Sequence, residues 1–153
     1  LKKLDGGALI ARMANKGEKI DLLNGKTVTL TTDDIVIADN KRPIGIAGIM
    51  GGSMTEVDDS TTDILLEVAS FDMYAIRKTA MRFGLFTDAF TRFSKGQSPL
   101  QNDRVLAKFM EMLGEIAQAT QSSSVYDLTS ESTERALDRH AIHDPVQISV
   151  DFI

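Results

Sequence analysis

The chain has 153 residues, no cysteine and a net charge of −5, with a pI of about 5.0. Without cysteine it has no disulfide framework, thiolate zinc site or cysteine nucleophile, and its acidity argues against a globally basic nucleic-acid binder. Its hydrophobic content of 42% suits one compact domain, and we expect a soluble, cytoplasmic piece of a larger protein that begins here at Leu1, because no signal peptide or membrane-spanning run is visible.

Short runs of alternating apolar and polar residues predict strands in the first part of the chain. These runs cover residues 8–14, 18–23, 26–30, 34–39 and 42–48, and the apolar run 63–69 is predicted as a further strand. The dipeptide Asn24-Gly25 favours a type I′ hairpin turn, in which both central residues need a positive φ. The prediction is an α/β (α+β) domain with a central mixed or antiparallel sheet and flanking helices.

Two helices are predicted after the strands. Asp72 is a candidate N-cap for a helix over residues 73–83, and Gly84 is placed to end it in the left-handed conformation. Ser98-Pro99 opens a second, longer helix, with Gln101 completing a capping box. The apolar residues of this second helix are expected to face inward as scaffold: Val105, Phe109, Met112, Leu113 and Ile116.

The C-terminal part of the chain is more polar. A charged and polar segment extends to Asp144, and residues 145–153 (PVQISVDFI) restart a strand pattern with little chain left. We therefore expect one domain over residues 1–144 and the start of another at 145–153. His140 and His143 lie in the polar segment without an evident acid or nucleophile beside them, and no role is assigned to either.

Glu67 is the first candidate site residue. On a strand it would share one face with Leu65 and Ala69, where a carboxylate needs a partner. This placement favours a residue that lines a pocket. A glutamate on a half-exposed sheet face explains the same periodicity equally well.

The glycine-rich stretch GIAGIMGG, residues 45–52, is the second candidate. Gly48, Gly51 and Gly52 would let the main chain pass close to a ligand and offer N–H donors to an oxyanion or carbonyl. The stretch matches neither the phosphate loop nor the dinucleotide fingerprint. A tight bend after a strand is the simpler interpretation.

The third candidate is GLFTDAFTRFSKG, residues 84–96, in which Thr87 supplies a hydroxyl and Ala89 leaves space. Cationic residues are concentrated around this stretch: Arg77, Lys78, Arg82, Arg92 and Lys95. Together they could meet phosphates, although single cations are more often simply solvated. No Ser-His-Asp or metal constellation can be assembled, so no catalytic residue or metal ligand is assigned.

In this order and spacing, GIAGIMGG, ILLEVASFD and IRKTAMRFGLFTDAFTRFSKG resemble the B3/B4 region of bacterial phenylalanyl-tRNA synthetase beta subunits. The resemblance covers about residues 12–113, and residues 145–153 look like the entry to the B5 domain that follows. It implies an editing domain that hydrolyses tyrosine wrongly attached to tRNA(Phe). It also implies an alpha-subunit partner in an alpha2beta2 enzyme, with ATP and Mg²⁺ bound elsewhere and no cofactor in this domain.

The resemblance assigns roles to individual positions. Glu67 matches the glutamate that reads the tyrosine hydroxyl, and Thr87 and Ala89 match pocket positions. Gly51 matches a glycine whose main chain approaches the aminoacyl group, with Gly48 and Gly52 beside it. From the cationic residues named above, and not from a family position, the candidate tRNA contacts are Arg82, Arg92 and Lys95.

The chain departs from the family pattern at three places. A pocket histidine of the family precedes the position of Leu1, Phe90 stands where small residues are common, and Ser94 replaces an acidic residue. These departures support an alternative, a scaffold that contacts tRNA without editing. A freestanding protein acting on another aminoacyl-tRNA is a third interpretation.

Overall fold

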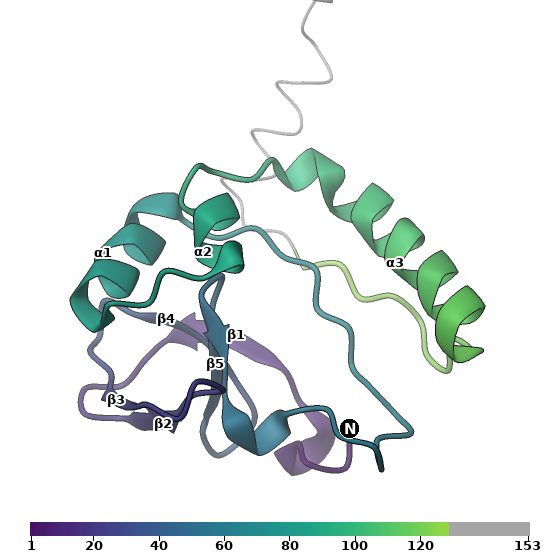
Figure 1. The fold of residues 1–153 in the computed structure, drawn as a ribbon, viewed down its shortest axis with the longest axis horizontal. Helices are drawn as coiled ribbons and strands as arrows, with labels where there is room; N and C mark the ends of the chain where they lie inside the picture. Colours follow the sequence, from purple (N-terminus) through teal and green to yellow (C-terminus); the bar gives the residue numbers. More distant parts are fainter. Residues whose placement is uncertain (129–153) are drawn as a thin grey trace, which may run out of the picture. The chain divides into compact units, whose positions relative to one another are not determined.

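The computed structural model describes residues 1–128, which belong to two units, Leu1–Ser98 and the unit that starts at Pro99. Among the described residues, the first unit contains all the strands and two helices, and the second contains one long helix (Figure 1). No helix among the described residues is long and apolar enough to cross a membrane. The predicted domain start at 145–153 and the two histidines lie outside the described residues, so the predicted domain division stays a prediction.

The main sheet has four strands in the order β1-β4-β5-β6, and every neighbouring pair is antiparallel. The strands are β1 (Ile10–Met13), β4 (Ile35–Ala38), β5 (Pro43–Ile46) and β6 (Met50–Gly51). Strands β4, β5 and β6 follow each other through short loops, whereas the β2–β3 hairpin lies between β1 and β4 in the chain. The strand signals predicted β1, β4 and β5 correctly, and β6 lies in the glycine-rich stretch that was predicted as a bend.

Strands β2 (Lys19–Asp21) and β3 (Thr27–Thr29) form a separate antiparallel hairpin in which Ile20 lies opposite Val28. The hairpin is confirmed, but its predicted turn type is wrong. Among the described residues only Gln118 has a positive φ without being glycine, so Asn24 lacks the φ that a type I′ turn requires. Gly25 alone is left-handed (φ +80°), as in three-residue loops that end in a bulge.

Helix α1 (Met73–Phe83) begins and ends where its caps predict. The Asp72 carboxylate accepts a hydrogen bond from the Ala75 amide at 2.8 Å, and Gly84 ends the helix with φ +63°. A short helix that was not predicted, α2 (Asp88–Phe93), lies within residues 84–96. Short 3₁₀ turns occupy Asp5–Gly7 and Ser53–Thr55.

The long helix α3 (Asn102–Ala117) follows a 3₁₀ turn at Pro99–Gln101, so the regular helix begins three residues later than predicted. The prediction that its apolar stripe faces inward is wrong, because no residue of α3 is buried. Exposed members of the stripe range from 42% for Phe109 to 78% for Ile116. Helical spacing identifies the side that favours burial, but it does not supply a surface for that side to pack against.

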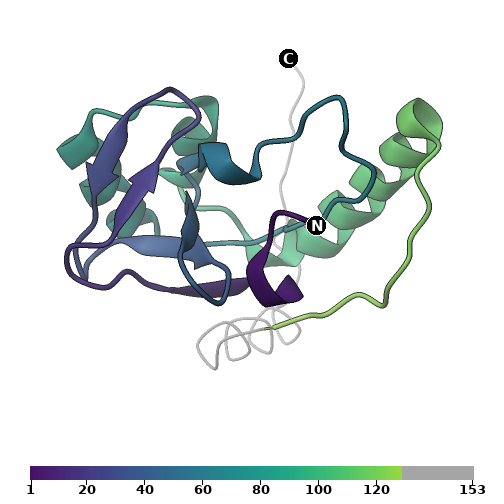
Figure 2. The ribbon, with the colours of Figure 1, turned by 90° about the horizontal axis from the view of Figure 1, so that it is seen from below.

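The predicted strand over residues 63–69 is also wrong. This stretch is irregular and pairs with no strand among the described residues, and in Figure 2 it belongs to the blue-green coil without arrows that leads away from the short 3₁₀ turn at Ser53–Thr55. Ile64 and Leu65 are 47% and 40% exposed. Apolar composition favours a strand, but a strand also needs a hydrogen-bonded neighbour, which composition cannot provide.

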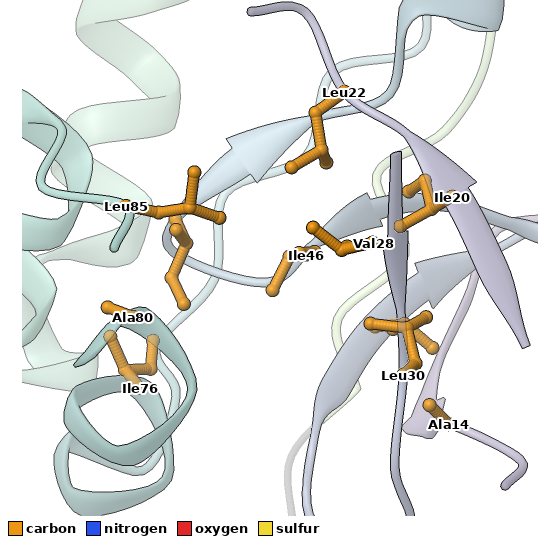
Figure 3. Close-up of a cluster of buried hydrophobic side chains, with 11 residues drawn as sticks. Ala14, Ile20, Leu22, Val28, Leu30, Ile46, Ile76, Ala80 and Leu85 are labelled. Atoms are coloured by element: carbon orange, nitrogen blue, oxygen red, sulfur yellow. The ribbon is translucent and has the colours of Figure 1, made fainter. Parts of the chain in front are cut away.

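The core of the first unit joins α1, the segment after it, the hairpin and the main sheet (Figure 3). Ile76 and Ala80 of α1 belong to the same buried cluster as Leu22 and Ile46. A smaller cluster of Ile37, Ile44 and Ala47 involves the opposite side of the sheet, because neighbouring strand residues point to opposite faces. The α+β class predicted from the sequence is confirmed.

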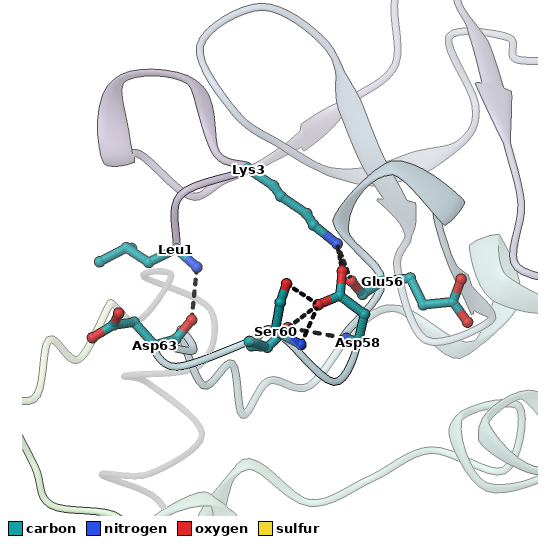
Figure 4. Close-up of polar contacts among 7 residues, drawn as sticks. Leu1, Lys3, Glu56, Asp58, Ser60 and Asp63 are labelled. Carbon is teal, nitrogen blue, oxygen red and sulfur yellow. Dashed lines mark hydrogen bonds and ion pairs between the residues drawn. The ribbon is translucent and has the colours of Figure 1, made fainter.

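Polar contacts join the first residues to the loop that follows β6 (Figure 4). Lys3 donates to the Asp58 carboxylate at 2.7 Å and to the Glu56 carbonyl at 2.6 Å. Asp58 also accepts hydrogen bonds from the amide and the hydroxyl of Ser60. These contacts give the loop a defined path although it contains no regular element.

Candidate functional site

Thr87 connects two of the three candidate motifs. Its hydroxyl donates to the carbonyl of Ile49, inside the glycine-rich stretch, at 2.7 Å, and accepts from the Phe90 amide at 3.0 Å. The second bond makes Thr87 the N-cap of α2. The fold therefore brings the glycine-rich stretch and the start of α2 together, and it uses the only proton of the Thr87 hydroxyl to do so.

Gly48 is required by close packing. Its φ of +64° is left-handed, and an added Cβ would lie 2.3 Å from Cδ1 of Ile76 and 3.0 Å from Cγ of Phe93. The bare backbone at this position therefore approaches side chains of α1 and α2. Gly48 is therefore explained by a tight bend that packs against two helices, as the simpler interpretation of the glycine-rich stretch predicts.

The two later glycines differ from each other. Gly52 is buried, its amide donates to the Ile44 carbonyl at 2.7 Å, and an added Cβ would lie 2.7 Å from that same oxygen. Gly51 is exposed, and an added Cβ would meet only the side chain of Leu23, at 3.2 Å. Of the three glycines, Gly51 is the one whose backbone is exposed.

Glu67 lies in the irregular segment before α1 and is an exposed residue. Protein atoms around its carboxyl group nevertheless desolvate that group and raise its pKa. Within the described residues the side chain has no hydrogen bond or ion pair, to the glycine-rich stretch, to Thr87 or to any other group. Glu67 is therefore an accessible acceptor without a partner in this part of the chain.

The residues after Thr87 contribute to packing. Ala89 is partly buried, and Phe90 packs against the main core cluster with its ring edge-on to Phe86 at 5.5 Å. Ser94 is buried, and its carbonyl accepts from Nε of Arg77 at 2.6 Å. The two departures from the family pattern thus lie in the packed interface between α1 and α2.

Three of the five cationic side chains have partners within the fold. One is Arg77, which donates to the Ser94 carbonyl as described above. The Arg82 guanidinium pairs with the buried Asp34 and lies 4.7 Å from the centre of the Phe83 ring. Lys78 pairs with Asp33 at 2.6 Å, and this ion pair lowers the pKa of the Asp33 carboxyl group.

Asp34 is the structural partner that holds Arg82, and nothing in the sequence pattern predicted it. It is fully buried and accepts from the hydroxyl of Thr79 at 2.6 Å and the amide of Thr31 at 2.8 Å. It therefore attaches α1 to the loop before β4. Its sequence signal, one aspartate of an Asp-Asp pair ahead of an apolar run, does not distinguish it from a solvated residue.

Arg92 and Lys95 have a different environment. Together with Asp88, Thr91 and Gln97 they line a hollow of about 350 Å³. Within the described residues neither cationic group has a side-chain partner. No group of three or more potential metal-ligating side chains occurs in residues 1–128.

The chain matches known proteins over most of its length. The family model described as B3/4 domain matches residues 1–118. A phenylalanine–tRNA ligase beta subunit of Carboxydothermus hydrogenoformans is 45% identical over 120 residues, which cover 78% of this chain and 15% of that protein. The beta subunit of Streptomyces avermitilis is 34% identical over 149 residues, covering 95% of this chain and 18% of that protein.

The chain thus spans under a fifth of the length of these relatives. The family match includes every candidate residue discussed above, since all of them lie between residues 48 and 97. On the strength of that match, this chain belongs to the B3/4 domain family.

Proposed function

We propose that this chain is the editing domain of a phenylalanine–tRNA ligase beta subunit and hydrolyses tyrosine misattached to tRNA(Phe). The relatives that bear this name support the parent enzyme, in which an alpha subunit would be the partner. The observation that carries the editing role is Glu67, an accessible carboxyl group that is desolvated and has no partner among the described residues.

An editing site is needed because the amino-acid binding pocket of such an enzyme does not fully distinguish tyrosine from phenylalanine. A pocket that accepts phenylalanine cannot strongly reject a near-isostere that only adds a hydroxyl group, so a second site must remove the error. Tyrosine is the larger of the two amino acids, and a second site therefore cannot sort it by admitting only smaller side chains. It has to recognise the hydroxyl group itself.

Glu67 has the chemistry for this recognition. A carboxylate accepts a strong hydrogen bond from a phenol hydroxyl, whereas phenylalanine would leave the same carboxylate desolvated and unpaired. Its raised pKa means that the accepting, ionised form becomes fully populated only at a higher pH than for an ordinary glutamate. Selectivity for tyrosine should therefore increase as the pH rises through that pKa.

The reaction itself is ester hydrolysis. Water attacks the carbonyl carbon of the aminoacyl ester, the bond to the ribose oxygen breaks, and a proton passes to that oxygen, which leaves free tyrosine and uncharged tRNA. Glu67 would select the substrate rather than activate the water. Gly51, with its exposed backbone, is the candidate for contact near the ester, and Thr87 and Ala89 are candidates for the wall of the pocket.

The test is deacylation of Tyr-tRNA(Phe) and Phe-tRNA(Phe) by the full-length enzyme that carries this domain. Glu67→Gln and Glu67→Ala should lower the tyrosyl rate relative to the phenylalanyl rate by at least about tenfold, the effect of losing one charge-assisted hydrogen bond. Glu56→Gln removes a carboxylate from an exposed loop and serves as the charge-matched control. Unchanged selectivity in folded Glu67 variants would refute the role.

A second function, a scaffold that contacts tRNA without editing, is favoured by one observation. The Thr87 hydroxyl is already engaged by Ile49 and Phe90, and Phe90 fills core space. The same assay separates the two functions. Absence of tyrosyl hydrolysis in the wild-type enzyme, with tRNA binding intact, would support the scaffold.

A further inference from the structure

Helix α2 has two chemically distinct sides. Phe90 and Phe93 pack against the main core cluster. Asp88, Thr91 and Arg92 recur at helical spacing on the other side, and they line the hollow together with Lys95 and Gln97, which follow the end of the helix. The hollow is therefore part of the solvent side of α2 and lies entirely within the first unit.

This region is positive in an acidic chain. Residues 73–97 contain five cationic residues and one acidic residue, a net charge of +4, whereas the whole chain carries −5. Partners within the fold already neutralise Lys78 and Arg82. Arg77 donates to the Ser94 carbonyl, and the one acidic residue, Asp88, lies in the lining of the hollow. Arg92 and Lys95 therefore leave this lining with a net charge of +1, and neither forms an ion pair within the described residues.

We propose that this hollow on the solvent side of α2 binds a phosphodiester group of RNA between Arg92 and Lys95. The proposal rests on the proposed function, because tRNA is the RNA that an editing domain would meet. Arg82, the third candidate tRNA contact, is not part of this site, because its guanidinium forms an ion pair with Asp34.

The chemistry of the hollow suits phosphate. The Arg92 guanidinium can donate two parallel hydrogen bonds to phosphate oxygens, and Lys95 adds a second positive charge. The proposed function favours RNA over an acidic protein segment as the ligand of the hollow, because tRNA is the substrate of that function.

The experiment is binding of unacylated tRNA(Phe) transcript by the full-length enzyme, measured as Kd over a series of salt concentrations. Each single variant, Arg92→Ala or Lys95→Ala, should lower the slope of log K against log salt by about 0.7, which corresponds to about fivefold weaker binding at 0.1 M salt. The double variant should show about twice the change in slope.

Lys78→Ala is the charge-matched control, because it removes one positive charge from an exposed ion pair one helix away. Its slope should remain that of the wild type. Equal slopes for all variants, or a change as large in Lys78→Ala, would overturn the proposal. A loss of binding to a polyglutamate peptide without a loss of tRNA binding would assign the hollow to acidic proteins instead.

The two proposals fail separately. The Arg92 and Lys95 variants are read by the Kd and salt slope of unacylated tRNA, whereas Glu67→Gln is read by the ratio of tyrosyl to phenylalanyl deacylation, so either result can fail without the other. An enzyme that never deacylates but loses tRNA affinity in the double variant would retain the phosphate site and lose only the editing function.

Discussion

Thr87 donates its hydroxyl proton to the carbonyl of Ile49 across 2.7 Å, and this bond attaches the start of α2 to the glycine-rich stretch. Both partners belong to motifs that carried the family resemblance. The fold therefore requires a hydroxyl group at position 87 whether or not Thr87 lines a pocket, because the same hydroxyl also caps α2.

Thr87→Val should lower the free energy of unfolding by about 2 kcal/mol. About half of this is the loss of the N-cap and the rest is the unpaired Ile49 carbonyl. Thr87→Ser, which keeps the hydroxyl, should stay within about 0.5 kcal/mol of wild type. Urea titration followed by circular dichroism measures both, and equal destabilisation by Val and Ser would contradict the role of the hydrogen bonds.

Gly48→Ala should be much more costly than Gly84→Ala, although the two glycines have nearly the same φ, +64° and +63°. Nothing lies within 4 Å of the Cβ position at Gly84, whereas Gly48 would place a methyl group 2.3 Å from Ile76. Left-handed strain of about 1–2 kcal/mol is common to both. The clash should add about 1–3 kcal/mol at Gly48.

The matched pair isolates that packing term, since the backbone strain cancels when the two unfolding free energies are subtracted. Thermal and urea unfolding of the two variants measure the difference. Similar losses for Gly48→Ala and Gly84→Ala would mean that the glycine-rich stretch can move away from α1 at little cost.

Arg82→Met should destabilise the protein by about 2 kcal/mol or more, because it leaves the fully buried Asp34 carboxylate without its countercharge. Lys78→Met breaks a neighbouring ion pair whose two side chains are more than half exposed, and it should cost less than about 0.5 kcal/mol. Unfolding in urea separates the two. If Arg82→Met were as mild as Lys78→Met, Arg82 would be released for contact with tRNA.

Glu18 should make stability depend on pH in the acid range. The Arg12 guanidinium donates two hydrogen bonds to this carboxylate, 2.8 and 2.9 Å long, and lowers its pKa from 4.5 to about 2. Because the folded pKa is depressed, the stabilisation is complete above pH 4.5 and is lost as the pH falls toward 2.

Glu18→Gln should therefore be less stable than wild type by about 1 kcal/mol at pH 6, after allowance for solvent screening of a partly exposed pair. The difference should shrink toward pH 2. Urea titrations at five or six pH values measure this convergence, and curves for wild type and variant that run parallel down to pH 2 would contradict it.

Local chemistry was predictable where a signal and its partner are close in the chain. The caps of α1 at Asp72 and Gly84 appear as expected, because each acts within one turn of helix. The hairpin was predicted for the same reason, although the turn type depended on the φ of Asn24, which the Asn-Gly pair favours but does not dictate.

By itself, the sequence determined the first strands, their hairpin, α1 and the family, since alternation, caps and motif spacing are properties of neighbouring residues. Tertiary structure decided the rest. Within residues 1–128, the stretch 63–69 pairs with no strand, the apolar stripe of α3 is not buried, and Arg82 is held by Asp34, 48 positions away. Each outcome depends on what distant segments place beside a residue, and residue type and local spacing do not carry that information.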